Sequence, residues 1–200
     1  MSPQRLWILA GLILVAPVLA QVVAKFPFLG DYRKELLHYA TVERPDGKSR
    51  DIYISKAAVE AVREGRSIPV GTVIAIDLHT ALPNGSETDA SSNGDYQKDA
   101  QGLWVRAQDD PYLHVLEKVP GEGSKAWIFG ALDPNTGDPE PGSSVPSDCL
   151  ECHRAALATD MVHTFDQLVR FAQTGQVQQV YCNQPGRQLC GFVNIGQSSN

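Results

Sequence analysis

Two cysteines and a histidine stand close together near the C-terminal end of the 200-residue sequence, in Cys149-Leu150-Glu151-Cys152-His153. Residues three apart lie on one face of a helix, so both thiols would point the same way. The spacing Cys-x-x-Cys-His is typical of covalent haem attachment, in which two thiols bind the vinyl groups of one porphyrin. The adjacent imidazole is then an axial ligand of the iron. The sequence therefore predicts one haem c per chain, bound through Cys149 and Cys152, with His153 as the metal ligand.

Three other chemistries use paired cysteines. A thioredoxin-like redox pair follows a strand directly, whereas a segment rich in proline and glycine, residues 133–147, precedes Cys149 here. A zinc site needs four ligands, and Cys182 and Cys190 do not have the short spacing of a second ligand pair. A disulfide between residues three apart is strained and uncommon. These alternatives stay open beside haem attachment, which the sequence favours.

The first 24 residues are apolar after Arg5 and predict an export signal peptide that is cleaved after Ala20 or Ala24. The alternative is a retained membrane anchor, because residues 6–24 approach the length of about 20 that spans a bilayer. Both interpretations place the rest of the chain outside the cytoplasm, and we expect it in the periplasm. Oxidising conditions there favour a disulfide between Cys182 and Cys190.

The charge of the chain argues against nucleic acid as a partner. The net charge is −6, and no run of lysine and arginine is present to neutralise phosphates. The remaining partner classes are a small ligand or substrate and a redox partner protein.

The hydrophobic pattern predicts strands in the first part of the chain and helices near its end. Arg44-Pro45-Asp46-Gly47 is a strong turn signal between two alternating segments, so these are expected to form a hairpin. Residues 113–117 fit either a helical turn or an extended segment. This order favours an α+β fold, a mainly antiparallel β-sheet with peripheral helices and a haem-attachment helix near the C-terminus. The expected strands are 36–43, 50–55, 72–80, 103–108 and 126–131, and the expected helices are 56–64, 149–158 and 164–173.

Three groups of motifs resemble the cytochrome P-460 family, which includes the beta-type cytochromes c prime. They are 43–47 leading into 50–54, 65–69 followed by 71–74, and 149–154 followed by 159–162. The resemblance covers roughly residues 36–171 and implies a haem domain over 25–174, with a C-terminal tail, 175–200, outside the family pattern. It also implies five-coordinate iron with an open distal side, often in a homodimer.

Members of that family differ in function. Some bind small gases such as nitric oxide, and others oxidise hydroxylamine and carry a bond from a lysine to the porphyrin. At the position of that lysine this chain has Ile76 next to Asp77, and Lys98, in the following loop, is the nearest alternative. We therefore expect a monohaem cytochrome that binds a small gas or passes electrons. The alternative is an oxidoreductase acting on hydroxylamine or a similar small nitrogen compound, so enzymatic activity is left open.

Several residues are candidates for the iron's other side. Asp77 is the candidate catalytic residue, because a carboxylate in a dry haem pocket has a raised pKa and can move protons. His79 alternates with it on the same expected strand and is the first candidate for a sixth ligand. Met161 is too close in sequence to His153 to reach the opposite haem face. The other histidines that can act as a sixth ligand are His38, His114 and His163.

Overall fold

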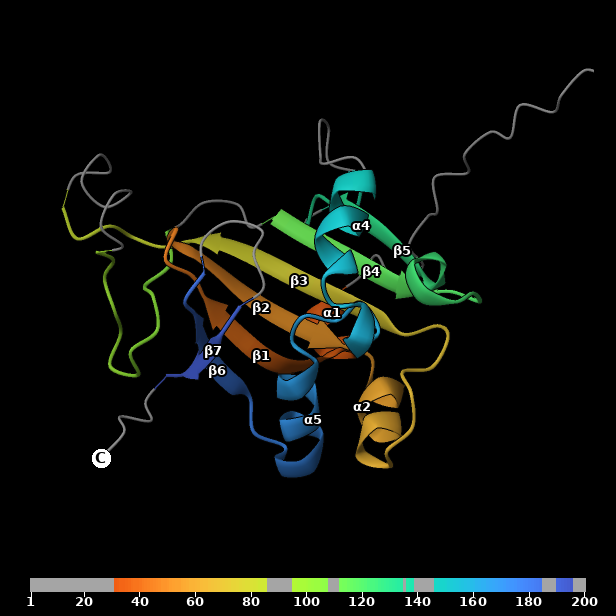
Figure 1. Ribbon diagram of the computed structural model, residues 1–200. Helices are drawn as coiled ribbons and strands as arrows, with labels where there is room; N and C mark the ends of the chain where they lie inside the picture. Colours follow the sequence, from red (N-terminus) through yellow and green to blue (C-terminus); the bar gives the residue numbers. More distant parts are fainter. Residues whose placement is uncertain are drawn as a thin grey trace, which may run out of the picture.

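The structure, a computed structural model, describes residues 31–85, 95–107, 112–134, 136–138, 146–184 and 190–195. These residues form a seven-stranded sheet with the order β5-β4-β3-β2-β1-β6-β7 (Figure 1). The expected signal segment, 1–24, lies outside the described residues. The strands are β1 (Leu37–Glu43), β2 (Lys48–Ile54), β3 (Val73–Thr80), β4 (Tyr112–Lys118), β5 (Trp127–Leu132), β6 (Gln178–Cys182) and β7 (Phe192–Asn194).

Short helices complete the fold. None of those in the described part of the chain is long and apolar enough to cross a membrane. The α-helices are α1 (Tyr32–Glu35), α2 (Lys56–Arg63), α4 (Pro146–Arg154) and α5 (Phe165–Thr174). The 3-10 helices are η1 (Gly123–Ala126) and η2 (Leu157–Thr159).

The expected α+β class and mainly antiparallel sheet are confirmed. Strands β1 to β5 pair antiparallel, each with its neighbour in the sheet. The β1–β2 turn ends at Gly47, whose φ of 70° is a left-handed conformation that glycine adopts at little cost. Residues 112–118 are a strand, so of the two forms expected for 113–117 the extended one is correct.

One expected strand is wrong. Of the expected strand 103–108, the described part, residues 103–107, does not form a strand, and within it only Trp104 and Arg106 make isolated bridges, to Lys98 and Ala81. The reason is that this segment divides its backbone hydrogen bonds between an irregular segment and the last residue of β3. The Val105 amide donates to the Gln97 carbonyl, while the Ala107 amide donates to the Thr80 carbonyl.

The C-terminal segment extends the main sheet. Strand β6 pairs parallel with β1, and β7 pairs antiparallel with β6. Val180 and Cys182 are fully buried, so β6 belongs to the hydrophobic core. The Cys182–Cys190 disulfide joins β6 to the residues just before β7.

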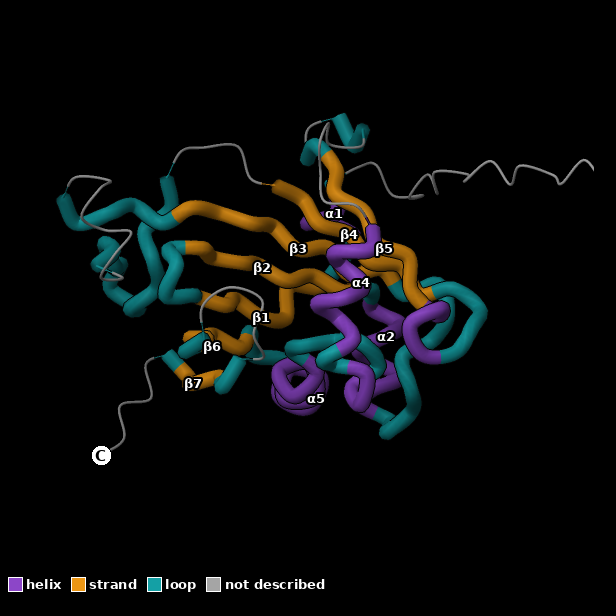
Figure 2. Tube along the Cα trace, turned by 45° about the horizontal axis from the view of Figure 1, so that its top comes forward, coloured by secondary structure: helices purple, strands orange, loops and turns teal. Residues whose placement is uncertain are grey.

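The two faces of the sheet carry different neighbours. Helices α2, α4 and α5 lie on one face, around a core that includes Ile54, Val59 and Leu168 (Figure 2). The opposite face packs Tyr32 of α1 against Tyr53, among a smaller buried cluster. The helix-covered face holds the candidate site.

Candidate haem site

A mostly apolar cavity lies between the sheet and α4. Its volume is about 240 Å³, and one water needs only roughly 10–15 Å³, so the cavity admits an organic ligand. Its lining gathers residues from α4, from the segment after it, from the strands and from the C-terminus. The apolar strand residues include Val42, Ile52, Ile74, Ile76, Leu116 and Phe129.

Helix α4 directs the predicted attachment residues into this cavity. Cys149 and Cys152 are half-buried thiols that both line it. Because they lie one helical turn apart, they face the cavity together. The described residues contain no group of three or more histidine, cysteine or acidic side chains that could hold a metal ion.

His153 also lines the cavity, and its ring is held in place. Its Nδ1–H donates a hydrogen bond of 2.6 Å to the Met161 carbonyl, and its ring centroid lies 5.0 Å from that of Phe129. Burial is the main cause that lowers the pKa of His153, so the imidazole is neutral at physiological pH. A neutral imidazole with one nitrogen engaged offers its other nitrogen, Nε2, to a metal.

The turn that carries the Met161 carbonyl is unusual. Asp160 and Met161 both have positive φ, 54° and 65°, a left-handed conformation that costs non-glycine residues free energy. Asp160 is held there by an ion pair with Lys118 and by the Trp127 indole N–H, 3.3 Å from Oδ1. The Met161 side chain is fully buried in the core. The sheet therefore positions the hydrogen-bond partner of His153.

Two arginines bring positive charge to the cavity wall. The Arg44 side chain is 3% exposed, and its Nη2 donates to the Gln184 carbonyl at 3.1 Å. Burial, and then the charge of Arg44, lower the pKa of Arg50 to about 10, so Arg50 is still a cation near neutral pH. Asp46 Oδ2 lies 3.6 Å from Arg44 Nε and supplies one carboxylate, and further anions are favourable beside charges buried in this way. The two carboxylates of a haem are anions that would suit this wall.

Two of the candidate sixth ligands, His114 and His163, line the cavity. His163 lies on the His153 side, with ring centroids 4.9 Å apart, and burial is the main cause that lowers its pKa to about 4. His114 comes from β4, paired with Ile76, and burial likewise lowers its pKa. Of the two, His114 alone projects from the sheet.

Asp77 and His79 do not face the cavity, and their expected placement beside the haem is wrong. Side chains alternate along a strand, so Ile74 and Ile76 of β3 line the cavity while Asp77 and His79 point to the opposite face. There Asp77 accepts hydrogen bonds from Tyr32 and from Arg33, whose Nη2 is 2.8 Å away. Asp77 thus fixes α1 to the sheet, and this position gives its expected catalytic role no support.

His79 and His38 gather around another carboxylate on that opposite face. His79 Nε2 lies 3.9 Å from one Asp51 oxygen, and His38 Nε2 lies 3.5 Å from the other. Arg106 binds the same carboxylate. Neither histidine lines the cavity.

The C-terminus supplies cavity residues that the sequence did not suggest. Cys190 and Phe192 both line the cavity, although their segment lies beyond the resemblance. The sequence likewise did not indicate that Arg50 and His114 line the same cavity. They come from separate strands, and only the strand register brings them together. The one sequence signal that could have placed Arg50 on this face is the alternation of Arg50, Ile52 and Ile54 along one strand.

An α+β fold in which two thiols and a neutral imidazole meet in an apolar cavity lined by cations suits a haem-binding protein. The residues present fit the group. The family model for Cytochrome P460 matches residues 30–164, which is more than half of the chain. The chain therefore belongs to the cytochrome P460 family, a family of haem-binding cytochromes. The comparison with curated proteins gives no match for this chain.

Proposed function

We propose that this protein is an exported monohaem c-type cytochrome that binds a small gas or passes electrons at an iron open on one side. The observation that carries the proposal is the convergence of Cys149, Cys152 and His153 on one apolar cavity. Each thiol would form a thioether with the porphyrin, and His153 Nε2 would bind the iron.

Haem supplies an iron that takes up a diatomic ligand or exchanges one electron. The chain's own residues do the rest. The Met161 carbonyl fixes the tautomer and orientation of His153. Ile52, Ile74 and Ile76 exclude water from the cavity floor. Arg44 and Arg50 hold positive charge on the cavity wall, which could pair with the haem carboxylates.

An open ligand side is supported by the residues that line the cavity. None of the described lining residues is a methionine or a lysine. Lys98 instead lies over the Trp104 ring, with Nζ 4.8 Å from its centroid. His114 lines the cavity and projects from the sheet floor. Iron binding by its imidazole would close the ligand side.

Export is a further part of the proposal. It rests on the apolar first 24 residues and is supported by the Cys182–Cys190 disulfide, since disulfides persist mainly in oxidising compartments. N-terminal sequencing of the periplasmic protein should give a start near Gln21 or Lys25. Intact Met1 in the membrane fraction would instead indicate an anchored domain.

The central experiment is haem staining after denaturing electrophoresis. Cys149→Ala and Cys152→Ala should lose most of the stain, because each variant lacks one thioether. Glu151→Ala is the matched control, since this exposed residue stands between the two cysteines and does not line the cavity. Stain equal to wild type in either cysteine variant would contradict covalent attachment.

An optical spectrum then tests the open site. The ferrous wild type should be high-spin and five-coordinate, and should bind carbon monoxide without loss of a protein ligand. His114→Ala should leave this spectrum high-spin. A low-spin wild type that becomes high-spin in His114→Ala would make His114 a ligand and favour simple electron transfer.

A further inference from the structure

The wall of the cavity farthest from β5 is built by the C-terminal hairpin. Phe192 of β7 and Cys190 line the cavity there. This hairpin lies after residue 164, where the family match ends. The wall is therefore a feature of this chain that the family match does not account for.

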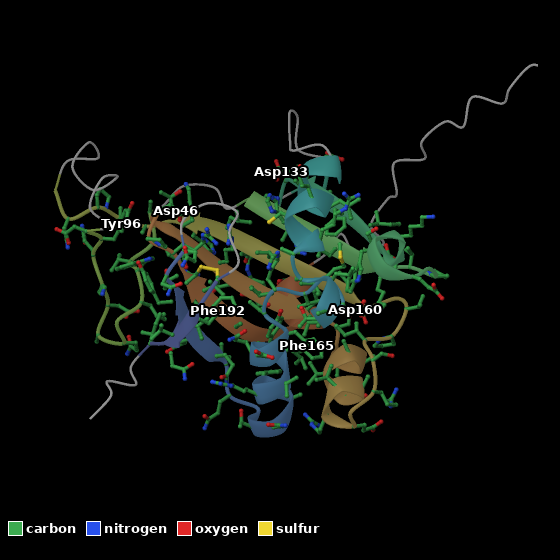
Figure 3. All side chains as sticks on the ribbon, viewed as in Figure 1. Asp46, Tyr96, Asp133, Asp160, Phe165 and Phe192 are labelled. Carbon is green, nitrogen blue, oxygen red and sulfur yellow. A yellow bond between two sulfur atoms is a disulfide. The ribbon has the colours of Figure 1, made fainter. Side chains whose placement is uncertain are left out.

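His153 and this wall lie at opposite ends of the sheet. His153 contacts Phe129 in β5, which is one edge strand, while Phe192 lies in β7, the other edge strand. Figure 3 shows Phe192 and the disulfide on the β7 side of the molecule, away from α4. A ligand that occupies the end of the cavity away from His153 would thus meet Phe192.

We propose that Phe192, positioned by the Cys182–Cys190 disulfide, sets the size of the ligands that reach the iron. This inference rests on the proposed function, because it assumes haem bound through His153. Phe192 is half-buried and packs against the main core, so its ring is a fixed part of the wall. Removing a packed aromatic ring leaves a void that a larger ligand can fill.

The disulfide anchors this wall to the buried part of the sheet. Cys182 is fully buried in β6, and Cys190 carries the chain back to the cavity. Arg44, itself a lining residue, lies against both sulfurs, with Nη1 3.8 Å from Cys182 Sγ and 3.6 Å from Cys190 Sγ. The Gly191 amide donates to the Asn183 side chain at 3.2 Å and closes the hairpin beside the disulfide. Loss of the disulfide should therefore loosen both Phe192 and Arg44.

Strand β7 offers a matched control for Phe192. Val193 follows it directly, is 56% exposed and does not line the cavity, because neighbouring side chains of a strand point to opposite faces. Phe192→Ala and Val193→Ala both shorten an apolar side chain of this short strand. They differ in whether the cavity is enlarged.

The experiment measures ligand affinity of the ferrous, haem-loaded protein by optical titration with carbon monoxide, methyl isocyanide and n-butyl isocyanide. Phe192→Ala should bind n-butyl isocyanide about tenfold or more tightly than wild type, the order expected for a few methylenes in an apolar site. Its carbon monoxide affinity should change by less than about threefold, because that ligand already fits. Val193→Ala should match wild type for all three ligands.

Two further variants guard against misfolding. Phe192→Trp should weaken n-butyl isocyanide binding selectively, and the Cys182→Ala/Cys190→Ala double variant should shift the size preference in the same direction as Phe192→Ala. Equal size preference in wild type, Phe192→Ala and Phe192→Trp, all loaded with haem, would overturn the proposal. A wild type without covalent haem would instead overturn the proposed function, so the two failures are distinguishable.

Discussion

Glu43 offers a quantitative test of how burial couples protonation to folding. This carboxyl is 1% exposed, and its Oε2 has no hydrogen-bond partner among the described residues. Its Oε1 accepts two hydrogen bonds of 3.3 Å, from the Ser49 hydroxyl and the Trp104 amide. Burial outweighs these contacts and raises the pKa of Glu43 from 4.5 to about 7.

The sign of the effect on stability follows from the two pKa values. The unfolded chain releases the Glu43 proton near pH 4.5 and the folded chain near pH 7. Between these values the unfolded state binds fewer protons, so the free energy of unfolding falls as pH rises. One pKa unit corresponds to about 1.4 kcal/mol, so the full loss is about 3 kcal/mol above pH 7.

Glu43→Gln isolates this contribution because glutamine does not titrate. We expect the difference in unfolding free energy between variant and wild type to rise by about 3 kcal/mol from about pH 4.5 to about pH 8. Any constant cost of the buried amide cancels in this difference. The assay is guanidinium unfolding of the haem-loaded protein at several pH values.

Glu60→Gln on the exposed surface of α2 is the control, and its curve should run parallel to that of wild type. A Glu43→Gln curve that also runs parallel, within about 1 kcal/mol, would refute the assignment of a raised pKa to Glu43.

Three other predictions concern the positions of single side chains. His79→Ala should leave the ferrous spectrum unchanged, because this ring lies on the sheet face opposite the cavity; a change of spin state would place it at the iron. Asp160→Asn removes the ion pair with Lys118, so it should lower the unfolding free energy by about 1–3 kcal/mol. The variant should retain haem but shift the iron–histidine stretching frequency in Raman spectra. An unshifted frequency would show that Asp160 does not position His153. Leu168→Ala should cost about 2–5 kcal/mol in urea unfolding, since Leu168 is fully buried. Leu157→Ala, 54% exposed, should cost less than about 0.5 kcal/mol, and equal costs would contradict this account of the core.

The sequence was sufficient for features encoded by neighbouring residues. The Pro45-Asp46-Gly47 turn between two alternating segments predicted the β1–β2 hairpin, which the structure contains. The helical hydrophobic period predicted a helix over residues 164–173, which the structure contains as α5. The family resemblance was confirmed by the match over residues 30–164. Turns, caps and helical periodicity are local signals, so no tertiary contact is needed to recognise them.

The register and faces of the sheet were decided by tertiary structure. Alternation in β3 predicted two faces but not which one meets α4, and Asp77 was therefore assigned to the wrong side. The same register brings Arg50 and His114 to one cavity from separate strands. Alternation along a strand does not say which face of the sheet is covered. The packing of helices on one face decides this.

The C-terminal segment shows the same limit at longer range. Two cysteines around a turn indicated a local disulfide, which the structure contains. Its position against Arg44 and the cavity could not be predicted, because it depends on β6 pairing in parallel with β1. More than 130 residues separate Val42 from its partner Val180 in that pairing. No local sequence pattern specifies such a contact. The pairing is favoured because it buries Val180 and Cys182 fully in the core.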